Sequence, residues 1–143
     1  MKLTIELVPQ TCWYSNVRSN VTKKDWDIIR KKCYSNANYK CEICGGVGKT
    51  HPVECHEIWE YDDTNLTQKL IGLISLCPTC HKVKHIGLAR INGEDQICIN
   101  QLMKVNKWDR TTTLLHIDEA FKLWEFRSQS KWILNIDFLK TYL

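Results

Sequence analysis

The chain has 143 residues, of which 43% are hydrophobic and 25% are charged, and its formal net charge is +4. This length suits one compact domain, and the composition excludes a largely disordered chain. We therefore expect a single domain over residues 1–143, whose small positive charge permits an anionic partner without requiring one.

The cysteines point to metal binding inside a cell. Residues 1–7 lack the apolar run of a signal peptide, and no stretch is apolar enough to anchor the chain in a membrane. We expect a soluble, cytoplasmic protein with no membrane partner, in which paired Cys-x-x-Cys units favour metal over disulfides. Cys12, Cys33 and Cys98 lie outside those units and are expected to be core thiols.

The first 38 residues predict a strand, a loop and a helix. Residues 3–8 alternate apolar and polar side chains up to Pro9, which predicts a short strand, with residues 133–138 as its partner. Residues 12–20 read as a polar loop with aromatic residues. A helix over 23–37 should follow, with Thr22 and Asp25 forming a capping box.

The polar face of that helix is basic. Lys24 and Lys31 lie on it and are our candidates for phosphate contacts, although a solvated charged face is the simpler alternative.

Two Cys-x-x-Cys pairs supply the strongest signal in the chain. Cys41, Cys44, Cys77 and Cys80 offer four thiolates, which is the ligand set of a closed tetrahedral zinc site. Gly45 and Gly46 follow the first pair and let the backbone bend so that its amides face the sulfur atoms. We expect a structural Zn²⁺ ion here.

The segment between the two pairs predicts a β-hairpin, and a helix follows it. Residues 52–61 and 70–76 read as strands, joined by the turn residues 62–65. Pro78 suits the first turn of a helix, which places His81 and His85 one turn apart on the same face. This pair suggests a second metal site.

The remainder of the chain predicts helices. Apolar residues recur at helical spacing over 94–106, including Ile97 and Cys98, and over 112–126, including Leu114. We expect an α+β domain with three parts: a strand and helix over 1–38, a ββα core over about 39–87, and a helical scaffold over 88–143.

The cysteine pairs, with His56 on the hairpin and His81 after the last cysteine, resemble the HNH endonucleases, whose core is a ββα-metal fold. The resemblance covers roughly residues 41–85, about a third of the chain. It implies that His56 is the general base, that His81 and His85 bind a catalytic divalent ion, and that the four cysteines hold a structural zinc. The implied reaction is hydrolysis of DNA phosphodiester bonds, leaving a 5′ phosphate.

Two positions depart from the family pattern. Cys55 stands where an Asp usually precedes the catalytic His, and Gly72 stands where the family has Asn. The third ligand of the catalytic ion is then Cys55, which favours zinc-like metals, or an oxygen of Glu57 or Glu54, which favours Mg²⁺ or Mn²⁺. We expect an oxygen, because a second thiolate-bound zinc would lose Lewis acidity.

Two functions follow. The first is a metal-dependent endonuclease using Mg²⁺, Mn²⁺, Ni²⁺ or Zn²⁺, with DNA phosphates held by the first helix and by Lys82, Lys84 and Arg90. The alternative is a zinc-stabilised module on the same fold that binds nucleic acid or protein without cleaving it. His51 and His116 are read as ordinary surface or boundary residues.

Overall fold

The computed structural model describes residues 1–12 and 16–143, so Trp13, Tyr14 and Ser15 of the expected loop lie outside the described residues. The described chain forms an α+β fold. Its elements, in order, are η1 (Gln10–Cys12), α1 (Val17–Asn20), α2 (Lys23–Asn36), β1 (Glu54–Asp62), β2 (Thr67–Leu76), α3 (Pro78–Lys84), α4 (Ile86–Ile91), α5 (Asp95–Asn106), α6 (Arg110–Arg127), β3 (Ile133–Asn135) and η2 (Asp137–Thr141).

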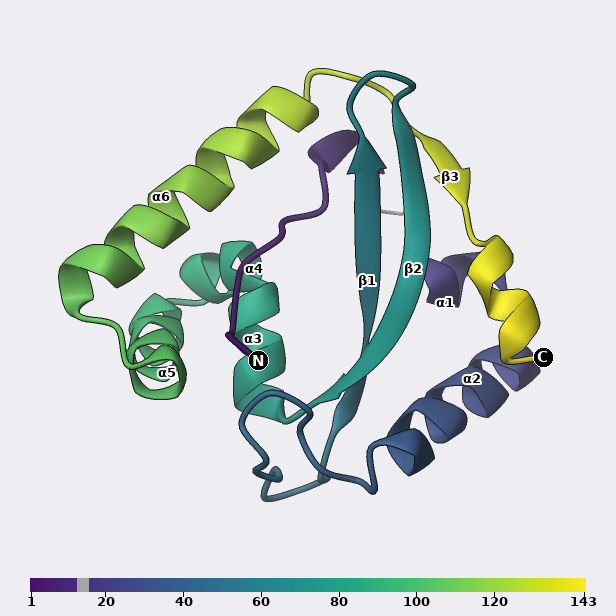
Figure 1. The fold of residues 1–143 in the computed structure, drawn as a ribbon, viewed down its shortest axis with the longest axis horizontal. Helices are drawn as coiled ribbons and strands as arrows, with labels where there is room; N and C mark the ends of the chain where they lie inside the picture. The colour runs from purple at the N-terminus through teal and green to yellow at the C-terminus, as the bar shows by residue number, and fades with distance from the viewer. Residues whose placement is uncertain (13–15) are drawn as a thin grey trace.

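The antiparallel hairpin of β1 and β2 is the centre of the fold (Figure 1). Its turn is stabilised by Asp62, whose Oδ1 accepts hydrogen bonds of 3.0 Å from the amides of Thr64 and Asn65. The register shifts by a bulge at Ile58/Trp59, and β3 adds a short parallel strand to the far edge of β2. Hairpin, turn and following helix therefore confirm the predicted order.

The hairpin separates two hydrophobic clusters. Helices α3 to α6 lie on one side of it in Figure 1, whereas α1, α2 and the C-terminal η2 lie on the other. Leu76, Val83 and Leu102 belong to the larger cluster on the first side, and Val17 and Ile29 belong to the smaller one on the second. Because side chains alternate across a strand, neighbouring residues of β1 face different clusters.

Local sequence explains where the two site-bearing helices begin. The Thr22 side chain accepts a hydrogen bond from the amide of Asp25 and caps α2, as the capping box predicts. Cys77 caps α3 in the same way through its sulfur, and Pro78 occupies the first turn, where a missing amide hydrogen costs nothing. Helix α3 ends at Lys84, so His85 is its C-cap residue.

The predicted N-terminal strand is wrong. Residues 3–8 join no sheet, and β3 pairs with β2 instead of with them. Polar side chains of the C-terminal helices satisfy this segment: Asn106 bonds both the amide and the carbonyl of Leu3 at 2.7 Å, and His116 Nε2 accepts from the amide of Ile5 at 2.9 Å. His116 is thus a structural residue, because its ring accepts the backbone hydrogen bond of Ile5 that a neighbouring strand would otherwise accept.

The C-terminal helices are confirmed, but their buried faces differ in part from the prediction. Cys98 and Leu102 of α5 and Ile117 of α6 are buried, as expected, whereas Ile97 and Leu114 are exposed. Helix α6 buries only Thr113, Ile117 and Ala120, so several of its apolar residues remain at the surface. None of the helices in the described part of the chain combines the length and the apolarity that a bilayer crossing demands.

Candidate metal centres

The first centre is the four-cysteine cluster at the base of the hairpin. The sulfur atoms of Cys41, Cys44, Cys77 and Cys80 all lie within 4.8 Å of one another. Cys44 Sγ and Cys77 Sγ are 3.6 Å apart. Two sulfur ligands of one tetrahedral zinc, each about 2.3 Å from the ion, would be separated by about 3.8 Å. The cluster therefore has the ligands and the dimensions of a zinc site.

Backbone amides face the sulfur atoms, as the glycines predict. The amides of Cys44, Gly46 and Cys80 each donate to a cysteine sulfur at 3.4 Å. Gly45 makes this bend possible with φ of +75°, a left-handed conformation that favours glycine. Hydrogen bonds from the Cys80 thiol and from backbone amides lower the pKa of Cys41, which favours the thiolate that a metal binds.

The second centre is a cluster of three histidines between β1 and α3. The rings of His81 and His85 have centroids 4.7 Å apart, and His56 approaches them at 5.1 and 5.3 Å. The Nε2 atoms of His81 and His85 are 3.1 Å apart. Two imidazole ligands of one tetrahedral ion would have nitrogens about 3.3 Å apart, since each metal–nitrogen bond is about 2.0–2.1 Å.

Glu54 orients one of these histidines. Nδ1 of His81 donates to Glu54 Oε1 at 2.9 Å, which leaves Nε2 with the lone pair and facing Nε2 of His85 at 3.1 Å. The other carboxylate oxygen accepts from Nε2 of His51 at 2.8 Å. Burial raises the pKa of Glu54, but the hydrogen bonds to His81 and His51 outweigh it and hold the pKa below its usual value. Glu54 is therefore a carboxylate at neutral pH.

His56 supplies an independent sign of a missing ligand. Its Nδ1 is buried and has no hydrogen-bond partner among the described residues. Burial lowers the pKa of His56 well below its usual value, and loss of water around the ring of His85 lowers its pKa to about 4, although His85 as a residue is exposed. A metal binds the neutral form of imidazole, so the lowered pKa values of His56 and His85 favour the form that can act as a ligand.

The structure does not bring Cys55 or Glu57 to this cluster, which corrects their expected role as metal ligands. Cys55 lines the cavity that Glu54 and His81 also line, but its thiol contacts Cys33 of α2, and that contact and burial raise its pKa. Glu57 lies on the same face as Cys55 and accepts from the amide of Val17; burial raises its pKa. The alternation of β1 forces this division, since His56 and Glu54 share the other face.

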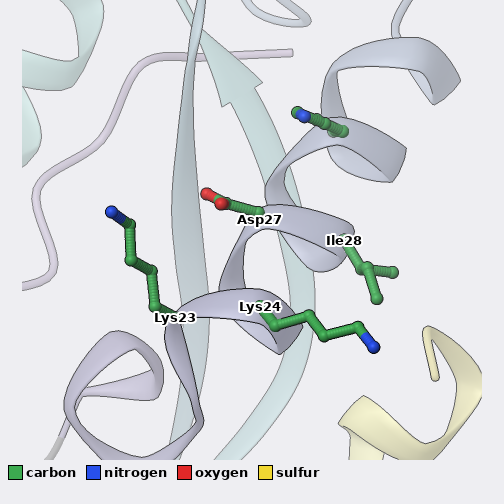
Figure 2. A pocket seen from close by; sticks show the side chains of 5 residues that line it. Lys23, Lys24, Asp27 and Ile28 are labelled. Atoms are coloured by element: carbon green, nitrogen blue, oxygen red, sulfur yellow. The ribbon is translucent and has the colours of Figure 1, made fainter.

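The two lysines expected on the polar face of α2 lie at the surface of the molecule. Lys24 and Lys31 are exposed and line a shallow surface depression on that helix. Figure 2 shows Lys24 and Ile28 extending to one side of the helix and Lys23 and Asp27 to the other. The helix therefore presents positive charge in two directions.

The three cations expected around the metal cleft have partners within the chain. Lys84 is buried and bonds Glu6 at 2.8 Å and the carbonyl of Thr4. It therefore stabilises the N-terminal segment and is not available for the DNA contact that we expected. Lys82 pairs with Glu94 at 2.7 Å. Arg90 is an exposed residue, and its guanidinium lies 4.2 Å from the ring centroid of Phe121.

Sequence reasoning missed His51. It was read as a surface residue, yet it shares the carboxylate of Glu54 with His81. Its spacing of three residues from Glu54 was visible, but the loop geometry that brings the pair together was not.

Comparison of the chain with protein-family models, with curated proteins and with solved structures finds no match.

Proposed function

We propose that this protein is a metal-dependent endonuclease that hydrolyses phosphodiester bonds in DNA. The observation that carries the proposal is the three-histidine cluster, with its paired Nε2 atoms 3.1 Å apart and Glu54 behind His81. Support also comes from the order of hairpin, helix and four-cysteine cluster, which is similar to the ββα-metal core of HNH endonucleases. The cytoplasm of a bacterial cell or of a phage-infected host is the setting this resemblance implies.

Each residue of the cluster has a proposed task. A divalent ion held by His56, His81 and His85 would polarise the scissile phosphate and lower the pKa of a water molecule. Glu54 keeps the proton of His81 on Nδ1, and burial keeps His56 neutral, so both lone pairs stay available. Three neutral nitrogen ligands favour zinc, nickel or cobalt over Mg²⁺.

The role of His56 changes in this proposal from general base to third ligand. A general base must reach the attacking water, whereas His56 has a buried Nδ1 and lies beside both other imidazoles. We propose His51 as the general base that accepts a proton from the attacking water. Its side chain is 51% exposed, and its ring is held by Glu54.

Plasmid cleavage with matched metal analysis tests the proposal. We expect His81→Ala and His56→Ala each to lose one of two bound ions and to reduce cleavage by at least about a hundredfold, because the loss of a ligand removes the ion's electrostatic stabilisation, worth several kcal/mol. His116→Gln, which alters a histidine outside the cluster, is the control and should cleave normally.

Three results would change the proposal. Unimpaired cleavage by His81→Ala would remove the metal mechanism. Loss of cleavage by His56→Ala with both ions retained would restore His56 as the general base. Binding of DNA without cleavage by any of Zn²⁺, Ni²⁺, Mn²⁺ or Mg²⁺ would favour the non-catalytic binding module instead.

A further inference from the structure

A cavity lies directly beside His81 of the histidine cluster. Its volume is about 710 Å³, within the range of small-ligand sites. One wall comes from α1 and α2, and the other includes Glu54 and His81 of the candidate metal centre. A molecule in this cavity would therefore lie next to an ion held by the histidines.

The helical wall carries cations suited to phosphate. Arg18 and Lys23 are exposed, line the cavity, and form no ion pair within the described chain. Arg30 also lines the cavity. Its Nε bonds Asp27 at 2.9 Å, and Nε is only one of the donor atoms of the planar guanidinium group. The acids of the cavity already have partners, since Asp27 pairs with Arg30 and Glu54 with two histidines.

The same wall carries an aromatic surface. Trp26 is half-buried: it packs against the cluster of Val17 and Ile29 and also lines the cavity. Tyr34, which lies further along α2 than Trp26, also lines the cavity. Cations beside aromatic rings are the elements with which proteins hold a single nucleic-acid strand, the cations at the phosphates and the rings at the bases.

We propose that this cavity holds a nucleotide of a single DNA strand, with its base stacked on Trp26 and its phosphate at Arg18 and Lys23. A base inside a duplex is stacked on its neighbours and cannot also stack on a side chain, so the strand must be unpaired at this point. This inference rests on the proposed function and specifies its substrate as single-stranded DNA or the unpaired strand of a junction.

Binding of a fluorescein-labelled phosphorothioate oligonucleotide, which resists cleavage, tests the proposal by anisotropy with the full, zinc-loaded chain. We expect the single strand to bind about tenfold or more tightly than a duplex of the same sequence. Trp26→Leu should weaken single-strand binding by about 5- to 150-fold, because stacking contributes about 1–3 kcal/mol per base. Trp26→Phe should restore most of it.

Trp59→Leu is the matched control, since Trp59 packs on the same hydrophobic cluster but does not line the cavity. Thermal melts of both leucine variants show whether either loses its fold. Lys23→Gln provides a surface change that does not depend on the core, and it should reduce the salt dependence of binding by about 0.7 log unit per log unit of salt.

Equal affinity for single strand and duplex would overturn the inference, as would equal losses in Trp26→Leu and Trp59→Leu. Cleavage of an unmodified single-stranded oligonucleotide and of a plasmid, measured in parallel, separates this failure from failure of the proposed function. Cleavage that needs His81 but is insensitive to Trp26 would support the proposed nuclease function and contradict nucleotide binding in the cavity. Single-strand binding that needs Trp26, without any cleavage, would support nucleotide binding in the cavity and contradict the nuclease function.

Discussion

The four-cysteine cluster and the three-histidine cluster both use helix α3, where Cys80 and His81 are neighbours, and they differ in how many metal positions their side chains fill. The cysteines supply four ligands, three of them buried, and backbone amides already face their sulfurs. The histidines supply three ligands, one of them exposed, and Glu54 adds a carboxylate that orients the ring of His81. A closed site holds a chain together, whereas an open one can take a substrate.

Helix α3 couples the two clusters. Cys77 and Cys80 lie at its N-terminal end, and His81 and His85 follow within the next two turns. A metal at the cysteines would therefore fix the helix that presents the histidines to β1. We expect damage at the cysteines to abolish both sites and damage at the histidines to affect only one.

The largest effect should come from Cys77→Ser. Structural zinc contributes about 10–16 kcal/mol of apparent binding free energy in small domains, so loss of a ligand should leave much of the chain unfolded. Elemental analysis and circular dichroism measure the two losses together. Cys98→Ser changes a buried thiol outside the cluster and should keep its metal and its fold; equal damage by both variants would show that the cysteine cluster has no special role.

Stepwise chelation should separate the clusters in the wild-type protein. We expect a chelator of moderate strength to remove the ion at the histidines first, because three neutral nitrogens bind zinc less tightly than four thiolates. Cleavage would then stop while the melting temperature stays nearly constant. Simultaneous loss of both ions, with unfolding, would contradict the distinction between a closed and an open site.

Glu54→Gln should weaken metal binding at the histidines by about 10- to 100-fold, since a carboxylate that fixes a ligand's tautomer has effects of this size. Isothermal titration with Zn²⁺ or Ni²⁺ measures the change. Glu57→Gln alters a carboxylate three residues away on the other face of β1 and should leave the affinity unchanged. The opposite ranking would restore Glu57 as a metal ligand.

The smallest effect should come from Cys55→Ser. Its thiol contacts Cys33 of α2 and does not belong to the histidine cluster, so we expect a cost of about 1 kcal/mol in the free energy of unfolding and no change in metal content. Urea denaturation and elemental analysis measure both quantities. Loss of the second ion would return Cys55 to the metal site.

Much of the fold could be predicted because its signals are local. The cap of α2 depends on residues three apart, the turn at Asp62 depends on adjacent amides, and the cysteine knuckle depends on a Cys-x-x-Cys-Gly-Gly spacing. The N-terminal segment was mispredicted because its alternation is real but its hydrogen-bond partners, Asn106 and His116, lie more than a hundred residues away.

The sequence by itself determined that four cysteines could form one zinc site and that His81 and His85 share a helical face, because both follow from spacing along the chain. Only the tertiary structure decided that His56 joins them, that Glu54 bonds His81 while Cys55 and Glu57 face away, and that Lys84 is buried. The physical reason is the packing of β1 between two clusters: alternation sorts its residues into two sets, but only the helices packed on each face decide which set meets the histidines.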